Sequence, residues 1–298
     1  MESSTTQTVF DELLHYLKYA SSAYSPICPR PNGSILIAHV PSLLFATLLA
    51  GSVGFVAYDP IRKELIVALR GRQANPLAPQ AMHNSNMPHL VQPSIRTQFC
   101  HVQFFLQALC SNYNAFVLDG VRVHTGFFLA WNSVCLQVLT ILTEQLSLHQ
   151  DIVRIVTTGH SLGGSLATLS AISIKQRFPQ CSVATYSTKN SPILSTQLSA
   201  MLPFEVPSFP SFQLGLGVDT TLVVHTHDGV PTMIPRSLGY HHHGIEYWQA
   251  DEPANAENIL RCEAHGEDPK CSSSIPSTGI NDAHFTYLGI EAIRPFCL

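Results

Sequence analysis

The sequence predicts an α/β fold with a mostly parallel central sheet flanked by helices. Short segments rich in β-branched residues, such as 152–156 and 220–228, alternate with longer segments of helical pattern, such as 127–149 and 162–178. Buried β-branched strands that alternate with helices are typical of proteins in which helices cover a parallel sheet.

The composition is that of a folded chain with a sizeable core. Hydrophobic residues make up 45% of the 298 residues and charged residues 12%, with a net charge of −4 and a pI near 6.4. So low a charged fraction argues against a disordered protein, and the lack of a basic excess argues against nucleic acid as a partner. We expect a single domain over residues 1–298.

The first segment predicts an amphipathic helix, because apolar residues recur there at helical spacing. These residues are Phe10, Leu13, Leu14 and Leu17. The stretch lacks the basic start and the apolar core that together define a secretory signal peptide.

Residues 35–58 are apolar and long enough to span a membrane, but polar and helix-breaking residues interrupt them. We therefore predict two buried strands joined by an apolar loop, and no transmembrane span. Residues 54–59 and 64–71 predict neighbouring strands joined by a short turn. Residues 73–101 are rich in Pro, Asn, Gln and His, and predict a long irregular excursion of the kind that is functional or mobile.

The second half continues the alternation of helices and strands. A helix is predicted over 127–149, a strand over 152–156, and a helix over 162–178 that stops before Pro179. A further strand is predicted over 220–228, and a last helix over 283–293.

The segment Gly159-His160-Ser161-Leu162-Gly163 follows a predicted strand and precedes a predicted helix. This is the context of a nucleophile elbow, in which a serine on a strained strand-to-helix turn projects its hydroxyl above the sheet. Small residues are needed two positions before and after the serine, because strand and helix approach closely there. The backbone N–H of Leu162 can then stabilise an oxyanion. We expect His160 to pack near the elbow rather than to react.

A serine nucleophile needs a base, and the base needs an orienting acid; in this architecture both follow the serine, acid first. Asp228 ends the predicted strand 220–228, whereas Asp219 lies at its opposite end. His284 lies in a loop-like stretch before the last predicted helix, and Asp282 beside it has no strand to place it. We therefore predict a triad of Ser161, Asp228 and His284.

The rival histidines are His225, His227, His241, His242, His243 and His265. Three adjacent histidines at 241–243 suggest a metal site, but neighbours in regular structure do not all point at one ion, and no acidic or sulfur ligand has suitable spacing. We expect no metal and no cofactor, and a polar loop near the substrate face instead.

The eight cysteines form no Cys-x-x-Cys pair. Cys262 and Cys271 flank a polar loop that a disulfide could close, and Cys28 and Cys297 could tie the two ends of the chain. Bridges would imply an oxidising compartment. The alternative is that several of the eight are buried free thiols, above all Cys110, Cys135 and Cys181.

Five blocks of the sequence together resemble the fungal class 3 lipases, in the family's order and at similar spacing. The blocks are VHTGFFLAWNSV (123–134), TTGHSLGGSLATL (157–169), VVHTHDGVPTMIP (223–235), GYHHHGIEYW (239–248) and DAHFTYLG (282–289). The resemblance spans about residues 10–298 and implies an α/β-hydrolase fold. It implies the same triad, Ser161, Asp228 and His284, and it matches both cysteine pairs to the family's usual bridges in position.

The resemblance also supplies a second oxyanion donor, the residue after Arg-Gly at a strand end, which is Arg72 here. The family usually has Ser or Thr at this position, so Arg72 keeps the backbone N–H but lacks the hydroxyl that helps to hold the geometry. Residues 73–101 occupy the place of the family's helical lid without forming a clean amphipathic pattern. Residues 183–197 depart from the family's usual Gly-x-Pro-Arg-Val-Gly block.

The sequence thus predicts a serine hydrolase that acts on carboxylic esters, with acylglycerols as the expected substrates, working at a lipid–water interface. Similar lipases are secreted, so we expect an extracellular location. A feruloyl or other carboxylesterase on the same scaffold is one alternative. A catalytically impaired lipid-binding homologue is another, and the departures at Arg72 and at 183–197 favour it.

Overall fold

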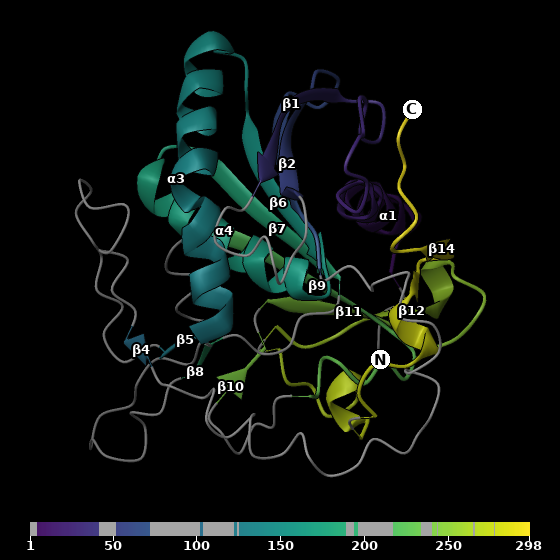
Figure 1. The fold of residues 1–298 in the computed structure, drawn as a ribbon. Helices are drawn as coiled ribbons and strands as arrows, with labels where there is room; N and C mark the ends of the chain where they lie inside the picture. The colour runs from purple at the N-terminus through teal and green to yellow at the C-terminus, as the bar shows by residue number, and fades with distance from the viewer. Residues whose placement is uncertain are drawn as a thin grey trace.

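The architecture comes from a computed structural model (Figure 1). The structure describes residues 5–41, 52–71, 102–103, 122–123, 125–188, 194–195, 217–233, 240–242, 244–264, 266–276 and 278–298. The expected excursion at 73–101 lies outside these residues, as do Arg72, Cys100, Cys110, His243 and His265.

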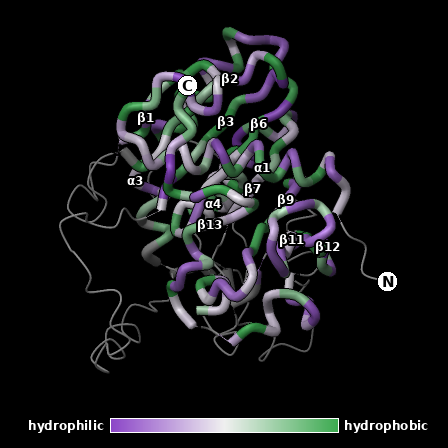
Figure 2. The backbone as a smooth tube through the Cα atoms, turned by 90° about the vertical axis from the view of Figure 1, so that its right-hand side faces the viewer, coloured by the Kyte–Doolittle hydropathy of each residue, from purple (hydrophilic) through white to green (hydrophobic). Residues whose placement is uncertain are grey.

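An eight-stranded sheet forms the centre of the molecule, in the order β1-β2-β3-β6-β7-β9-β11-β12. The pairings from β3 to β11 are parallel, and the outer ones are antiparallel. The labels in Figure 2 follow the same order across the molecule. The strands are β1 (Ile35–Pro41), β2 (Ser52–Asp59), β3 (Glu64–Leu69), β6 (Arg154–His160), β7 (Ser182–Thr188), β9 (Val218–His225), β11 (Ile245–Gln249) and β12 (Ile259–Arg261). The predicted fold class, with its mostly parallel sheet, is confirmed.

In the described part of the chain, α-helices cover both faces of this sheet (Figure 1). Helix α4 (Leu162–Arg177) packs on β6 and β7, with α3 (Thr125–Leu148) beside it, and α1 (Gln7–Ser22) packs on the opposite face against β3, β6 and β7. A second sheet of two-residue strands contains β4 (Val102–Gln103), β5 (Arg122–Val123), β8 (Leu194–Ser195) and β10 (Tyr240–His241). The 3₁₀ turn η4 (Ala256–Asn258) lies between β11 and β12, and the 3₁₀ turn η5 (Ser272–Ser274) follows β12.

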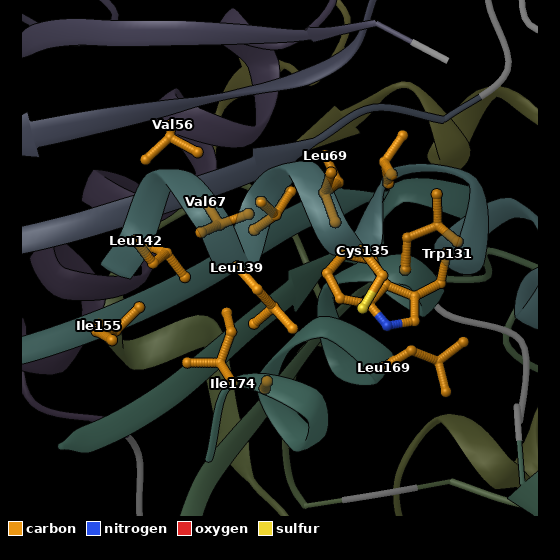
Figure 3. Close-up of a cluster of buried hydrophobic side chains, with 14 of the residues drawn as sticks. Val56, Val67, Leu69, Trp131, Cys135, Leu139, Leu142, Ile155, Leu169 and Ile174 are labelled. Atoms are coloured by element: carbon orange, nitrogen blue, oxygen red, sulfur yellow. The ribbon is translucent and has the colours of Figure 1, made fainter. Parts of the chain in front are cut away.

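The two faces of each central strand supply two separate cores, as the two-residue period of a strand requires. In β3, Val67 packs toward α3 and α4 while Ile66 packs toward α1. Figure 3 shows the larger core, in which Trp131 and Cys135 of α3 lie among the apolar side chains. Trp131 also donates its indole N–H to the hydroxyl of Ser173 on α4 at 2.9 Å, so the buried polar atom is satisfied.

The predicted first helix is confirmed as α1, whose apolar residues face the sheet. Thr6 caps it, because its side chain accepts a hydrogen bond from the backbone of Val9. The segment 35–58 contains β1 and β2, which pair antiparallel. β2 is buried as predicted, but β1 is an edge strand with most residues half-exposed, so it was wrong to expect a fully buried strand there. Among the described residues, no helix combines the length and the apolar character needed to cross a membrane.

The helix predicted over 283–293 is wrong. Residues 282–291 form a 3₁₀ turn, η6 (Asp282–His284), and a hairpin of β13 (Thr286–Tyr287) and β14 (Ile290–Glu291). Leu288 and Gly289 connect the hairpin with φ of 49° and 76°. Positive φ at both central residues is the signature of a tight hairpin turn, and it is incompatible with a continuous helix.

The strand predicted over 220–228 ends three residues early, at His225. Thr226 has φ of 37°, which turns the chain out of the sheet, so Asp228 lies in the turn after β9 rather than in the strand. Asp219 lies within β9, near its amino end. Within the divergent segment 183–197, residues up to Thr188 complete the regular strand β7.

Both predicted disulfides are present, Cys28–Cys297 and Cys262–Cys271. The thiol of Cys135, which lies outside both disulfides, is buried as expected. That of Cys181 is only half-buried, because it follows the end of α4 at the rim of the core.

Candidate active site

Ser161 occupies a sharp turn between β6 and α4. Its φ of 59° and ψ of −130° lie outside the regions that L-residues ordinarily adopt. The turn is held by neighbours on both sides: the Ser161 N–H donates to the carbonyl of Thr188 at the end of β7, at 3.1 Å, and the Gly164 N–H donates to the Ser161 carbonyl at 2.9 Å. A strained residue that its surroundings over-determine is typical of a functional site.

Glycines make this turn sterically possible. A Cβ on Gly159 would lie 2.2 Å from the carbonyl oxygen of Gly163, and one on Gly163 would lie 2.1 Å from that of Leu69. Both obstacles are backbone atoms, which cannot move aside as a side chain could. The close approach of strand and helix that the sequence motif predicted is therefore present.

His284 lies against Ser161, although the two residues are 123 positions apart. The Ser161 hydroxyl lies 3.3 Å from the Nε2 atom of His284, within hydrogen-bond distance. His284 is buried on the turn η6, and Ser161 is half-buried. The serine can donate its proton to this nitrogen, as nucleophilic activation requires.

Asp228 lies behind His284 and is 1% exposed. One carboxylate oxygen, Oδ1, accepts the Val230 N–H at 3.1 Å. The other, Oδ2, accepts the Tyr287 hydroxyl and lies 3.9 Å from the Nδ1 atom of His284. That distance is longer than a hydrogen bond, and catalytic hydrogen bonds are often long in a site without substrate. Tyr287 was not singled out by the sequence; burial and the neighbouring Asp228 raise its pKa, which keeps it a donor.

The two predicted oxyanion donors are Leu162 and Arg72. Leu162 is the first residue of α4, where backbone N–H groups lack helical partners. Arg72 lies outside the described residues, but Gly71 before it lies against the elbow, where an added Cβ would be 2.9 Å from the Cβ of Ser161. The described chain therefore passes beside Ser161 at Gly71.

A second imidazole, His160, links the elbow to the segment of His284. Its Nε2 atom lies 3.0 Å from the carbonyl oxygen of His284, and its Nδ1 atom lies 2.7 Å from the hydroxyl of Tyr24. The Tyr24 hydroxyl also accepts the Gly71 N–H at 3.2 Å. Burial raises the pKa of Tyr24, so it keeps its proton. His160 thus packs beside the elbow as expected, and it also makes polar contacts that the sequence did not reveal.

The rival residues whose side chains the structure describes are engaged elsewhere or exposed. Asp219 and Asp282 are both exposed, and neither is recorded in contact with His284. His242 is buried, with Nδ1 2.9 Å from Glu267 and Nε2 2.8 Å from the carbonyl oxygen of Pro231. Both of its ring nitrogens therefore have protein partners. His227 is exposed, and His225 is buried beside Ala283.

Comparisons with known proteins agree with this architecture. A family model of the lipases (class 3) matches residues 96–238. A lipase of Rhizopus niveus is 27% identical over 264 residues, 88% of this chain and 55% of that protein. A secreted mono- and diacylglycerol lipase of Fusarium solani is 27% identical over 208 residues, 70% of this chain and 50% of that protein. The chain spans about half the length of these curated relatives.

Among solved structures, a triacylglycerol lipase from Penicillium expansum superimposes with a TM-score of 0.75 at 19% identity, covering 99% of this chain and 98% of that one. The fold is therefore that of the α/β-hydrolases, as the sequence blocks predicted. Within that class, the chain is similar to the class 3 lipases, whose family model matches residues 96–238.

Proposed function

We propose that this protein is a serine ester hydrolase that acts on acylglycerols, with Ser161 as nucleophile, His284 as base and Asp228 as the acid that orients it. The observation that carries the proposal is the 3.3 Å contact between the Ser161 hydroxyl and His284, on a strained elbow with a buried carboxylate behind the imidazole. These three groups come from three separate segments of the chain. A glycine-rich turn with an inert serine would not require a histidine and a buried carboxylate beside it.

In the first half of the reaction, the Ser161 oxygen attacks the ester carbonyl carbon while its proton passes to Nε2 of His284. The carbonyl π electrons move onto the oxygen, and this oxyanion accepts hydrogen bonds from the backbone N–H groups of Leu162 and Arg72. Collapse of the intermediate breaks the bond to the alcohol, which takes the proton from His284 as it leaves. An acyl-enzyme on Ser161 remains.

In the second half, His284 removes a proton from water, and the resulting hydroxide attacks the acyl carbon. The second intermediate collapses to the carboxylic acid, and the Ser161 oxygen regains its proton from His284. Asp228 keeps a proton on Nδ1 and stabilises the imidazolium at both stages. With Nδ1–Oδ2 at 3.9 Å, this role requires the two groups to close together when substrate binds.

Acylglycerols are the proposed substrates because the relative from Fusarium solani is named for mono- and diacylglycerols. That relative is also named as secreted, and this chain has two disulfides, so we propose an extracellular location and a lipid–water interface as the working site. We further propose that the chain is a single domain in which residues 73–101 serve as a lid-like excursion.

The test is an ester panel of triolein, a short-chain nitrophenyl ester and methyl ferulate, run on the wild type and on Ser161→Ala. We expect triolein turnover that Ser161→Ala abolishes, with a fluorophosphonate probe labelling Ser161 in the wild type alone. Methyl ferulate as the best substrate would favour a feruloyl esterase. Lipid binding equal in both proteins, without turnover or labelling, would favour the impaired lipid-binding homologue and overturn the proposal.

A further inference from the structure

Residues 281–288, here called the catalytic loop, are held by side chains from several other elements. Two successive carbonyl oxygens of this loop each lie 3.0 Å from a ring nitrogen of a buried histidine outside the triad. His225 Nδ1 contacts the Ala283 carbonyl, and His160 Nε2 contacts the His284 carbonyl. A carbonyl can only accept, so each imidazole donates.

His225 has a second partner on the opposite side of its ring. Its Nε2 atom lies 2.8 Å from the carboxylate of Glu252. His225 is itself buried, and its ring lies 5.7 Å from that of Tyr287, centroid to centroid. Anchors on both ring nitrogens fix the rotation of the imidazole and exclude the flipped orientation.

Glu252 differs from the other groups in its exposure, because its side chain is 55% exposed. It belongs to the segment that follows β11 and lies far from His284 in sequence. Because solvent screens the Glu252 end of this pair, the contact adds little to stability, and we attribute it to the orientation that it gives to the buried His225.

We propose that His225 and Glu252 are a pair of positioning residues for the catalytic loop: the Glu252 carboxylate orients His225, whose Nδ1–H holds the Ala283 carbonyl and thereby the backbone of His284. This inference deepens the proposed function and rests on it. The pair sets the distance from His284 to Ser161 and to Asp228 without touching the reacting atoms.

The physical reason lies in how the imidazole of His284 is fixed. The position of this ring depends on the backbone of His284, which directly follows Ala283. Among the described residues, none hydrogen-bonds the Nδ1 atom of His284. A displacement of about 1 Å in a reacting group can cost on the order of 10² in rate. Loss of an anchor on the preceding carbonyl is therefore expected to lower kcat and to leave substrate binding nearly unchanged.

The experiment compares kcat and KM for a short-chain nitrophenyl ester, and the rate of fluorophosphonate labelling, across matched variants. His225→Phe keeps a ring against Tyr287 but removes both N–H groups, and we expect kcat to fall on the order of 10-fold to 10²-fold with little change in KM. His225→Asn keeps a donor near the Nδ1 position and should recover part of the loss. Glu252→Ala should lower kcat, while Glu252→Gln, which still accepts from Nε2, should not.

His227→Asn is the control, since its side chain is exposed in the same segment. Wild-type kcat in Glu252→Ala, or no recovery in His225→Asn, overturns the inference and leaves the proposed function intact. A wild type that neither turns over esters nor labels overturns both. Glu252 lies at the surface, so Glu252→Ala decides the matter even if His225→Phe fails to fold, which melting curves would reveal.

Discussion

Ser161, the proposed nucleophile, has an unfavourable backbone conformation. A residue with φ of 59° and ψ of −130° that is not glycine stores about 1–3 kcal/mol of strain. The hydrogen bonds from Ser161 to Thr188 and from Gly164 to Ser161 hold it there. The backbone strain at this position lowers the stability of the fold, and it directs the Ser161 hydroxyl toward His284.

This strain predicts that Ser161→Gly is more stable than Ser161→Ala. Glycine adopts the elbow conformation freely, while its greater freedom in the unfolded chain offsets part of the gain, leaving about 1 kcal/mol. Urea unfolding of the two variants measures the difference. Both lack the hydroxyl, so both should be inactive, and equal stability would mean that the turn is unstrained.

His242 is a second residue whose environment has a measurable consequence. Burial alone would lower its pKa, but Glu267 and Glu246 raise the pKa above the ordinary value of 6.5. The pKa of His242 is therefore higher in the folded chain than in the unfolded chain. The stabilisation that results is fully present below pH 6.5, and it is lost as the pH rises through the folded-state pKa.

We therefore predict that the free energy of unfolding falls as the pH rises above 6.5, and that Glu267→Gln flattens this dependence. Because one partner of a buried pair is lost, Glu267→Gln should also be about 3 kcal/mol less stable in mildly acidic buffer. Denaturant melts across the pH range measure both effects. Glu257→Gln, at an exposed position, is the control, and a parallel pH dependence in Glu267→Gln would contradict the assignment.

At the scale of elements, β3, β6 and α4 approach one another very closely where α4 begins. The helix begins very close to the strands. A Cβ added to Gly163 would lie 2.1 Å from the carbonyl oxygen of Leu69 and 2.6 Å from the carbonyl carbon of Arg70. This contact places the start of α4, and with it the backbone N–H groups, beside Ser161.

Gly163→Ala should therefore push α4 away from β3. Overpacking against backbone typically costs 1–3 kcal/mol, and we expect about 3 kcal/mol here together with loss of the proposed esterase activity. Thermal or denaturant unfolding measures the loss. Gln176→Ala, near the other end of α4, should change stability little, and a Gly163→Ala variant of wild-type stability would show that the helix start can shift freely.

At the scale of the whole molecule, the two disulfides constrain the chain very differently. Cys28–Cys297 joins residues 269 positions apart, whereas Cys262–Cys271 joins residues 9 apart. The first ties the segment after α1 to the carboxyl end and so restricts nearly the whole unfolded chain.

The chain-entropy model predicts that Cys28→Ser with Cys297→Ser costs more stability than Cys262→Ser with Cys271→Ser, by roughly 3 kcal/mol. Denaturant unfolding of the two double variants measures the difference. A larger loss in the Cys262–Cys271 variant would mean that the short bridge acts mainly by holding its folded loop, not by restricting the unfolded chain.

Local patterns in the sequence determined much of this protein. The helix at 162–178, the strand before it and the glycines of the elbow are readable because each depends on residues only a few positions apart. The order of Ser161, Asp228 and His284 along the chain, with the blocks around them, was enough to nominate these three residues.

Only the tertiary structure decided where the catalytic loop lies and what holds it. The apolar spacing over 283–293 fits a helix or a hairpin, and the left-handed turn at Leu288 and Gly289 selects the hairpin. The contact of Tyr287 with Asp228 joins residues 59 positions apart, and that of Tyr24 with His160 joins residues 136 apart. Local periodicity carries no information on such pairs, because they form only when the sheet and its loops have brought distant segments together.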